Sequence, residues 1–191
     1  MMRIITGKAR GIKLATLEGE ATRPTAERVK EALFSMIQFE IEGRDLLDLF
    51  SGSGQLALEA LSRGAAHAVM LDKSKDAVKI IKTNAEKTKL APLCEIYNCE
   101  YRDYILKNRG RRFDIVFLDP PYALALCGKA IGEMMRADMI KPSTIIVCET
   151  GDGDVFGDDS ELSSKFDVVK SARYSHSYLT ILTPKKEVAD A

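Results

Sequence analysis

The sequence predicts an α/β fold whose mainly parallel sheet is closed by an antiparallel hairpin. From residue 45 onward, short apolar segments alternate with helical segments at a spacing typical of βαβ units. Two β-rich segments, 166–174 and 177–183, follow, and the break between them is too short for a helix. A chain of 191 residues can bury one such core without disulfides or metals.

The elements follow one another in a regular order. Residues 3–17 alternate short β-prone stretches around Gly7 and Gly11, which predicts a small hairpin, so residues 1–21 form an extension ahead of a main domain at 22–191. Thr25 is a candidate cap for the first helix. Strands are expected at 46–50, 68–71, 93–97, 113–118 and 144–148, with helices at 55–63, 74–89, 101–108 and 126–138.

Composition excludes several classes of protein. Hydrophobic residues are 46% and charged residues 29%, which argues against disordered, collagen-like and coiled-coil chains. Apolar runs are too short for a membrane span and no signal peptide is visible, so we expect a cytoplasmic protein. The four cysteines form no C-x-x-C pair and there are only two histidines, which favours reduced thiols over a zinc site. No large apolar helix face stands out, which favours a monomer.

Charge is balanced overall but unevenly spread. Residues 1–14 hold Arg3, Lys8, Arg10 and Lys13 and no acid, whereas residues 150–161 hold five acids and no base. A basic segment followed far along the chain by an acidic loop would orient the protein on a polyanion. The alternative for the basic segment is a solvated edge whose charges discourage strand aggregation.

A glycine turn indicates a nucleotide cofactor. Ser51-Gly52-Ser53-Gly54 follows the first predicted strand and opens a helix, and Ala57 completes a G-x-G-x-x-A pattern. Asp72 ends the next strand 20 residues after Gly52, as in a dinucleotide fingerprint. Taken alone, the pattern suggests NAD, or a tight turn without a ligand.

Asp48 changes that interpretation. A carboxylate four residues before Gly52 repels a pyrophosphate but suits an ammonium or sulfonium group, which favours S-adenosylmethionine. Asp72 would take the ribose hydroxyls, Glu100 the adenine amino group, and Tyr101 would pack on the adenine ring. The alternatives are that Asp48 caps a loop and that Glu100 merely precedes a helix.

The most informative segment is Asp119-Pro120-Pro121-Tyr122, after the strand predicted at 113–118. The carboxyl ends of parallel strands line the ligand crevice of such a sheet. The prolines remove two N–H donors, which leaves the Asp119 carboxylate and the Pro120 carbonyl as acceptors beside the Tyr122 ring. Two acceptors suit the exocyclic amino group of a nucleobase, whose lone pair they would aim at a methyl sulfonium while the ring stacks on the base. The alternative is a rigid turn without chemistry.

Together these residues resemble class I S-adenosylmethionine-dependent methyltransferases of the amino-methylating type, with D-P-P-Y as the catalytic motif. More narrowly, the chain is similar to the bacterial 16S rRNA guanine-N2 methyltransferases. The similarity covers most of the chain and is carried by segments 3–14, 23–34, 48–63 and 119–122. D-P-P-Y is shared with adenine and cytosine amino methylases, whereas the Arg-Gly and Arg-Pro-Thr segments narrow the family.

The resemblance implies a Rossmann-like seven-stranded sheet with an antiparallel terminal hairpin, and methyl transfer to a guanine N2 in 16S rRNA within an assembling small ribosomal subunit. Residues 123–126 are apolar where relatives often carry basic residues, which puts local RNA contacts there in doubt. The expected cofactor-binding residues are Arg23, Thr25, Asp48, Ser51, Gly52, Ser53, Gly54, Asp72, Lys73, Glu100, Tyr101 and Asp119. The expected catalytic residues are Asp119, Pro120, Pro121 and Tyr122, with no metal. The expected RNA-binding residues are Arg3, Lys8, Arg10 and Lys13.

Three other functions stay open at this point. One is amino methylation of another base, such as adenine N6, in RNA or DNA. The second is a non-catalytic RNA-binding assembly factor that keeps the fold. The third is an NAD-linked oxidoreductase, which Asp48 opposes. Glu59 and Arg63, one helical turn apart, are expected to pair on the helix surface.

Overall fold

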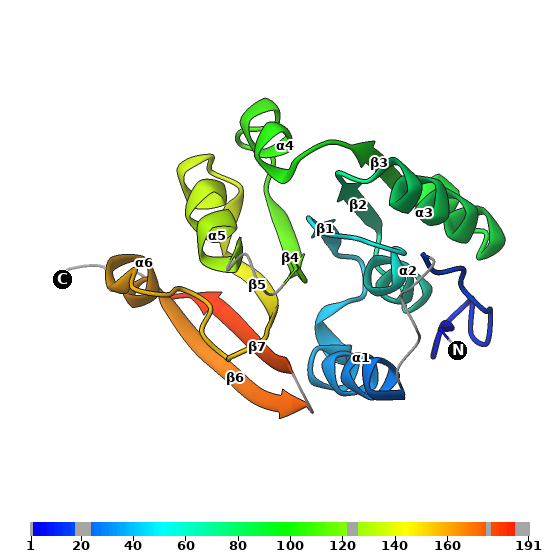
Figure 1. Cartoon of the computed structure of the whole chain (residues 1–191), viewed down its shortest axis with the longest axis horizontal. Helices are drawn as coiled ribbons and strands as arrows, with labels where there is room; N and C mark the ends of the chain where they lie inside the picture. The colour runs from blue at the N-terminus through cyan, green and yellow to red at the C-terminus, as the bar shows by residue number, and fades with distance from the viewer. Residues whose placement is uncertain (1, 18–23, 122–125, 175–176, 186–191) are drawn as a thin grey trace.

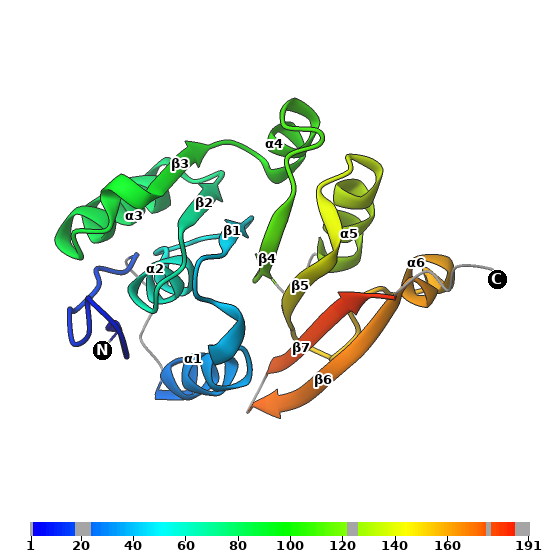
Figure 2. The same ribbon diagram turned by 180° about the vertical axis from the view of Figure 1, so that it is seen from behind.

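The computed structural model describes residues 2–17, 24–121, 126–174 and 177–185, and contains a seven-stranded sheet in the order β3-β2-β1-β4-β5-β7-β6 (Figures 1 and 2). Strands β1 to β5 pair in parallel, and β7 is antiparallel to both β5 and β6. The predicted fold class is therefore confirmed. The strands are β1 Asp45–Asp48, β2 His67–Asp72, β3 Cys94–Asn98, β4 Phe113–Leu118, β5 Ile140–Thr150, β6 Phe166–Tyr174 and β7 Ser177–Pro184.

Helices cover both faces of the sheet, as the alternating apolar pattern requires. One core cluster joins the first three helices to Leu46, Met70 and Phe117, and the other joins the next three to Leu47 and Val116. The helices are α1 Pro24–Met36, α2 Gln55–Ser62, α3 Lys75–Lys87, α4 Tyr101–Lys107, α5 Leu126–Arg136 and α6 Ser160–Ser164, with 3-10 turns η1 Gln38–Glu40 and η2 Ala91–Leu93. No helix within the described ranges is long and apolar enough to cross a membrane.

Three local expectations need correction. Helix α1 begins at Pro24, so Thr25 lies inside its first turn instead of capping it; proline suits the first helical position because its missing N–H has no partner there. Strand β5 extends beyond the predicted 144–148 at both ends. The acidic loop ends in a short helix, α6, because the Asp159 side chain accepts a hydrogen bond from Leu162 N and caps it.

The N-terminal segment, residues 2–14, is a loop closed by a single antiparallel bridge between Arg3 and Lys13, where two paired strands were expected. Its apolar residues Ile4, Ala9 and Leu14 are buried in the same core cluster as α1 and α2. Gly7 approaches the end of α2 so closely that a Cβ would lie 1.8 Å from the Ser62 carbonyl oxygen. The segment therefore packs into the main body.

Glu59 and Ser62 of α2 both hold this segment through hydrogen bonds, and the expected place of Glu59 on the helix surface is wrong. Its side chain is completely buried. The carboxylate accepts hydrogen bonds from the backbone N–H groups of Ile5, at 2.7 Å, and Thr6, at 3.0 Å. It also pairs with Arg63 at 2.9 Å and with the buried Lys30 at 3.4 Å. One carboxylate on α2 thus joins the N-terminal segment to α1.

Candidate active site

The loops that follow β1, β2 and β4 meet at the carboxyl edge of the sheet, where ligands bind in open α/β folds. The central strands are short, and apart from Asp114 near the start of β4 their interiors are apolar, so polar residues reappear at their carboxyl ends. Asp48, Asp72 and Asp119 stand at three of these ends. The structure thus brings together three acids that are far apart in the sequence.

The glycine turn after β1 leaves open space over one of its glycines. Gly52 and Gly54 both have positive φ, 53° and 76°, which favours glycine. A Cβ on Gly54 would lie 3.3 Å from side-chain atoms of Ile81 and Met70, so close packing adds to the preference for glycine there. A Cβ on Gly52 would meet nothing within 4 Å. A ligand can therefore approach the backbone at Gly52.

Both serines of this turn take part in hydrogen bonds that stabilise the loop. Ser51 is buried and its hydroxyl donates to the Asp48 carbonyl oxygen at 3.0 Å. Ser53 is also buried, and its carbonyl oxygen accepts a hydrogen bond from the side-chain amide of Asn84 at 2.9 Å. These contacts connect the turn to the end of β1 and to α3. They hold the backbone around Gly52 in place.

Asp72 links the ends of β1 and β2. One carboxylate oxygen accepts from Gly52 N at 3.0 Å and the other from Ser74 N at 2.8 Å. These two bonds fix the carboxylate beside the glycine turn, and each oxygen retains further lone pairs for a ligand. Lys73, the next residue, is exposed, and its carbonyl oxygen accepts from the Asn98 amide at 3.0 Å.

Asp48 is buried at the end of β1, and its carboxylate also caps the turn that follows. Its side chain is 2% exposed, and its carboxylate accepts from Phe50 N at 3.4 Å. Burial raises the pKa of Asp48 to about 7, with the hydrogen bond from Phe50 N opposing the shift. A cation bound nearby would favour the ionised form. The arrangement suits the ammonium or sulfonium group that the sequence predicts.

Of the two residues expected around adenine, one is exposed and the other is buried. Glu100 is exposed at the start of α4, where its side chain makes no capping hydrogen bond. Tyr101 is only 6% exposed, and its ring packs on Phe50 at 5.4 Å between centroids. Burial raises the pKa of the Tyr101 hydroxyl. Phe50, which is only half-buried, was missed from sequence because an aromatic residue after a strand carries no motif.

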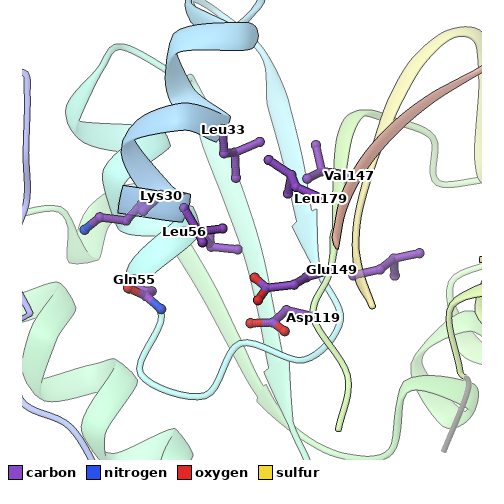
Figure 3. A pocket seen from close by; sticks show the side chains of 10 residues that line it. Lys30, Leu33, Gln55, Leu56, Asp119, Val147, Glu149 and Leu179 are labelled. Atoms are coloured by element: carbon purple, nitrogen blue, oxygen red, sulfur yellow. The ribbon is translucent and has the colours of Figure 1, made fainter. Parts of the chain in front are cut away.

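Asp119 and Pro120 follow β4, and Asp119 lines a pocket of about 200 Å³ (Figure 3). Asp119 is partly exposed, Pro120 is buried and Pro121 is exposed. Tyr122 and Arg23 lie outside the described residues, as does the side chain of Thr25. The apolar wall of the pocket consists of Val29, Leu33, Leu56, Leu118, Val147 and Leu179.

Three further polar residues line this pocket. Gln55 comes from the start of α2, Lys30 from α1 and Glu149 from β5. Figure 3 shows the Lys30 amine directed away from the two carboxylates. The amine donates a hydrogen bond to Arg3 O at 2.5 Å. Glu149 was not predicted from sequence. The signal for it is register: Cys148 is the partner of Leu118 across β4 and β5, so Glu149 and Asp119 follow paired residues.

The basic residues of the N-terminal segment lie at the surface. Arg3, Lys8, Arg10 and Lys13 are all exposed. Arg3 forms an ion pair with Glu27 at 2.8 Å, so an acid from α1 offsets its charge. The other three project from a loop that Glu59 anchors.

Comparisons with known proteins identify the family. The family model described as "Conserved hypothetical protein 95" matches residues 2–183. The chain belongs to this family. A relative from Haemophilus influenzae, named "Ribosomal RNA small subunit methyltransferase D", is 38% identical over 151 residues, which is 78% of each chain. The Escherichia coli protein of the same name is 33% identical over 149 residues, 78% of this chain and 74% of that protein.

Solved structures agree with this family. One named "Putative methyltransferase yhhF from Escherichia coli" is 26% identical, covers 97% of this chain and 99% of its own, and has a TM-score of 0.83. A structure titled "Crystal structure of SMU.776, a putative methyltransferase complexed with SAH", at 15% identity and a TM-score of 0.65, covers 78% of this chain and 49% of its own and shares the fold. The family member described here is a methyltransferase, and the predicted cofactor, S-adenosylmethionine, is supported.

Proposed function

We propose that this methyltransferase transfers a methyl group from S-adenosylmethionine to the exocyclic N2 of a guanine in 16S rRNA, within an assembling small ribosomal subunit. The observation that carries the proposal is the position of Asp119, which follows the carboxyl end of β4 and lines a pocket. The relatives named for the small-subunit RNA support the substrate class.

The residues at the strand ends fit the cofactor. Open space over Gly52 allows close approach to the backbone, and the fixed Asp72 carboxylate suits a ribose diol. Asp48 suits the positively charged methionine end, over which we place Arg23 and Thr25. When bound, S-adenosylmethionine supplies an electrophilic methyl group. Lys73, Glu100 and Tyr101 complete the proposed adenosine site.

Asp119 and Pro120 prepare the acceptor nitrogen. The lone pair of a nucleobase amino group is delocalised into the ring and is a weak nucleophile. The Asp119 carboxylate accepts one amino hydrogen and the Pro120 carbonyl the other, which favours a pyramidal nitrogen and directs its lone pair outward. Asp119 then takes the proton that the nitrogen loses on methylation. Pro121 stiffens the turn, and Tyr122 stacks on a base that has left its helix.

The basic N-terminal segment is the proposed RNA contact. Lys8, Arg10 and Lys13 of this segment are exposed, and Arg3 is paired with Glu27 of α1. Hydrogen bonds to Glu59 anchor the loop to α2. Phosphate contacts of this kind position a protein without reading sequence. Because ribosomal subunits assemble in the cytoplasm, the protein acts there, and we propose that it does so as a monomer.

The test is methylation of small subunits purified from cells that lack the protein, followed by nucleoside mass spectrometry. We expect N2-methylguanosine in 16S rRNA. Asp119→Asn should abolish product while cofactor affinity in calorimetry stays close to wild type. N6-methyladenosine as product would overturn the base assignment and keep the chemistry. A wild-type protein that binds subunits and cofactor but yields no methylated nucleoside would favour a non-catalytic assembly factor.

A further inference from the structure

Glu149 and Asp119 present two carboxylates to one pocket. They come from β5 and β4, which are neighbouring parallel strands, and each follows a residue of the Leu118–Cys148 pair. Adjacent strands lie about 4.8 Å apart, so the two side chains start at neighbouring points of the same edge. In the view of Figure 3 both carboxylate groups point toward the side-chain amide of Gln55.

The pocket beside these carboxylates is suited to a flat, apolar ring with polar atoms on one edge. Leu33, Val147 and Leu179 form part of its wall, and Glu149 is paired in register with Leu179 across β5 and β7. The ammonium group of Lys30 is engaged with Glu59 and Arg3 O. The edge of a base that faces Asp119 and Glu149 therefore meets hydrogen-bond acceptors.

Guanine and adenine differ in the hydrogen-bonding group that they would present to these two carboxylates. Next to its N2 amino group guanine carries N1–H, a donor, whereas next to its N6 amino group adenine carries N1, a lone-pair acceptor. We propose that Glu149 determines the choice of base by accepting the N1–H of guanine while Asp119 holds N2, and that adenine is rejected because its N1 would face a carboxylate. This inference rests on the proposed function.

The rejection follows from the repulsion between two acceptors. The N1–H of guanine donates to a carboxylate oxygen, whereas the N1 lone pair of adenine would face that oxygen, and such an unfavourable contact with the wrong ligand gives a site specificity. Loss of one hydrogen bond to a charged group typically changes affinity by about 10- to 100-fold. Glutamine at position 149 would keep an acceptor and add a donor, so it would tolerate either kind of N1.

The experiment uses small subunits reconstituted with 16S rRNA that carries either guanine or 2-aminopurine at the position mapped by mass spectrometry. 2-Aminopurine keeps the 2-amino group, but its N1 carries no hydrogen. Wild-type protein should methylate guanine about 100-fold faster in kcat/KM, and Glu149→Gln should reduce that ratio at least about tenfold. The fluorescence of 2-aminopurine reports independently whether the base leaves its stack and enters the pocket.

Two further variants make the result decisive. Glu161→Gln removes a carboxylate that pairs with Lys165 on α6, outside the pocket, and should leave the ratio unchanged. Glu149→Asp keeps the charge and should retain discrimination at a lower rate, even if Glu149→Gln folds poorly. A wild-type preference unchanged in Glu149→Gln, with N2-methylguanosine still formed, would overturn this inference alone. Absence of methylated guanine with the wild-type protein would overturn the proposed function, and this inference with it.

Discussion

Replacement of Glu59 by glutamine tests how the N-terminal segment is held. The Glu59 carboxylate is completely buried and faces four donors: Ile5 N, Thr6 N, the Arg63 guanidinium and the Lys30 amine. Glutamine has the same shape but no charge, and its amide nitrogen would face donors. The substitution leaves Lys30, whose side chain is 2% exposed, as a buried ammonium without its counter-ion.

The expected loss is large for a protein of this size. Breaking a buried ion pair by removing one partner costs about 3–5 kcal/mol, against a total free energy of unfolding of about 5–15 kcal/mol. Burial already lowers the pKa of Lys30, and Glu59 opposes that shift. In Glu59→Gln the folded state would therefore release the Lys30 proton at lower pH than the unfolded state. Stability of the variant should then recover as pH rises toward the ordinary lysine pKa of about 10.4.

Urea unfolding at two pH values measures both effects. We expect a loss of about 3–5 kcal/mol at pH 7, a smaller loss at pH 9.5, and faster amide exchange at Ile5 and Thr6. Lys30→Met added to Glu59→Gln should restore part of the stability, because it removes the stranded charge. The matched control is Glu31→Gln, an exposed carboxylate on α1, which should change stability by under about 0.5 kcal/mol. A loss below about 1 kcal/mol for Glu59→Gln would refute this reasoning.

Three further predictions concern the site and the RNA contact. Because burial raises the pKa of Asp48 to about 7, the folded state holds the Asp48 proton more tightly than the unfolded state, and stability falls as pH rises from 3.8 to 7. In the cofactor-free protein, Asp48→Asn should remove a pH dependence of stability of up to about 4 kcal/mol, measured by urea unfolding over this pH range. The same dependence of stability on pH in the wild type and the variant would contradict this. Asp72→Ala should weaken cofactor binding in calorimetry by about 1.5–3 kcal/mol, and unchanged affinity would remove Asp72 from the site. The double variant Arg10→Ala, Lys13→Ala should raise KM for the small subunit and leave cofactor affinity unchanged. The slope of log affinity against log salt concentration should fall by roughly one per lost phosphate contact. An unaltered KM across salt concentrations would show that the RNA contact lies elsewhere.

Most of the fold could be predicted because its signals are local. Buried parallel strands appear as short apolar runs, and each is followed by a turn and an amphipathic helix, so β4 and β6 were predicted to the residue. The length of β5 was underestimated because its first residues, around Pro142, carry polar and turn-forming side chains. The antiparallel ending was predictable because a two-residue break permits no crossover.

What could not be predicted depends on contacts between distant segments. A helix surface pair was the reasonable interpretation of Glu59 and Arg63, because a spacing of four residues is all that the sequence displays. The burial of Glu59 arises from the N-terminal loop, which lies more than fifty residues earlier in the chain. Similarly, the basic segment contains no acid, yet Arg3 is paired because α1 brings Glu27 beside it.

The pocket shows the same division between local and distant information. Asp119 was predicted because its chemistry is written in consecutive residues: the prolines after it remove donors and leave acceptors. Glu149 is an ordinary residue in the sequence, followed by a threonine and a glycine, and no motif surrounds it. It becomes a partner of Asp119 only through the pairing of β4 with β5. A one-residue shift of that register would turn its side chain to the opposite face of the sheet, among the buried residues around Cys148. The register of β4 and β5 therefore determines the position of the second carboxylate, and with it the choice of base that we propose.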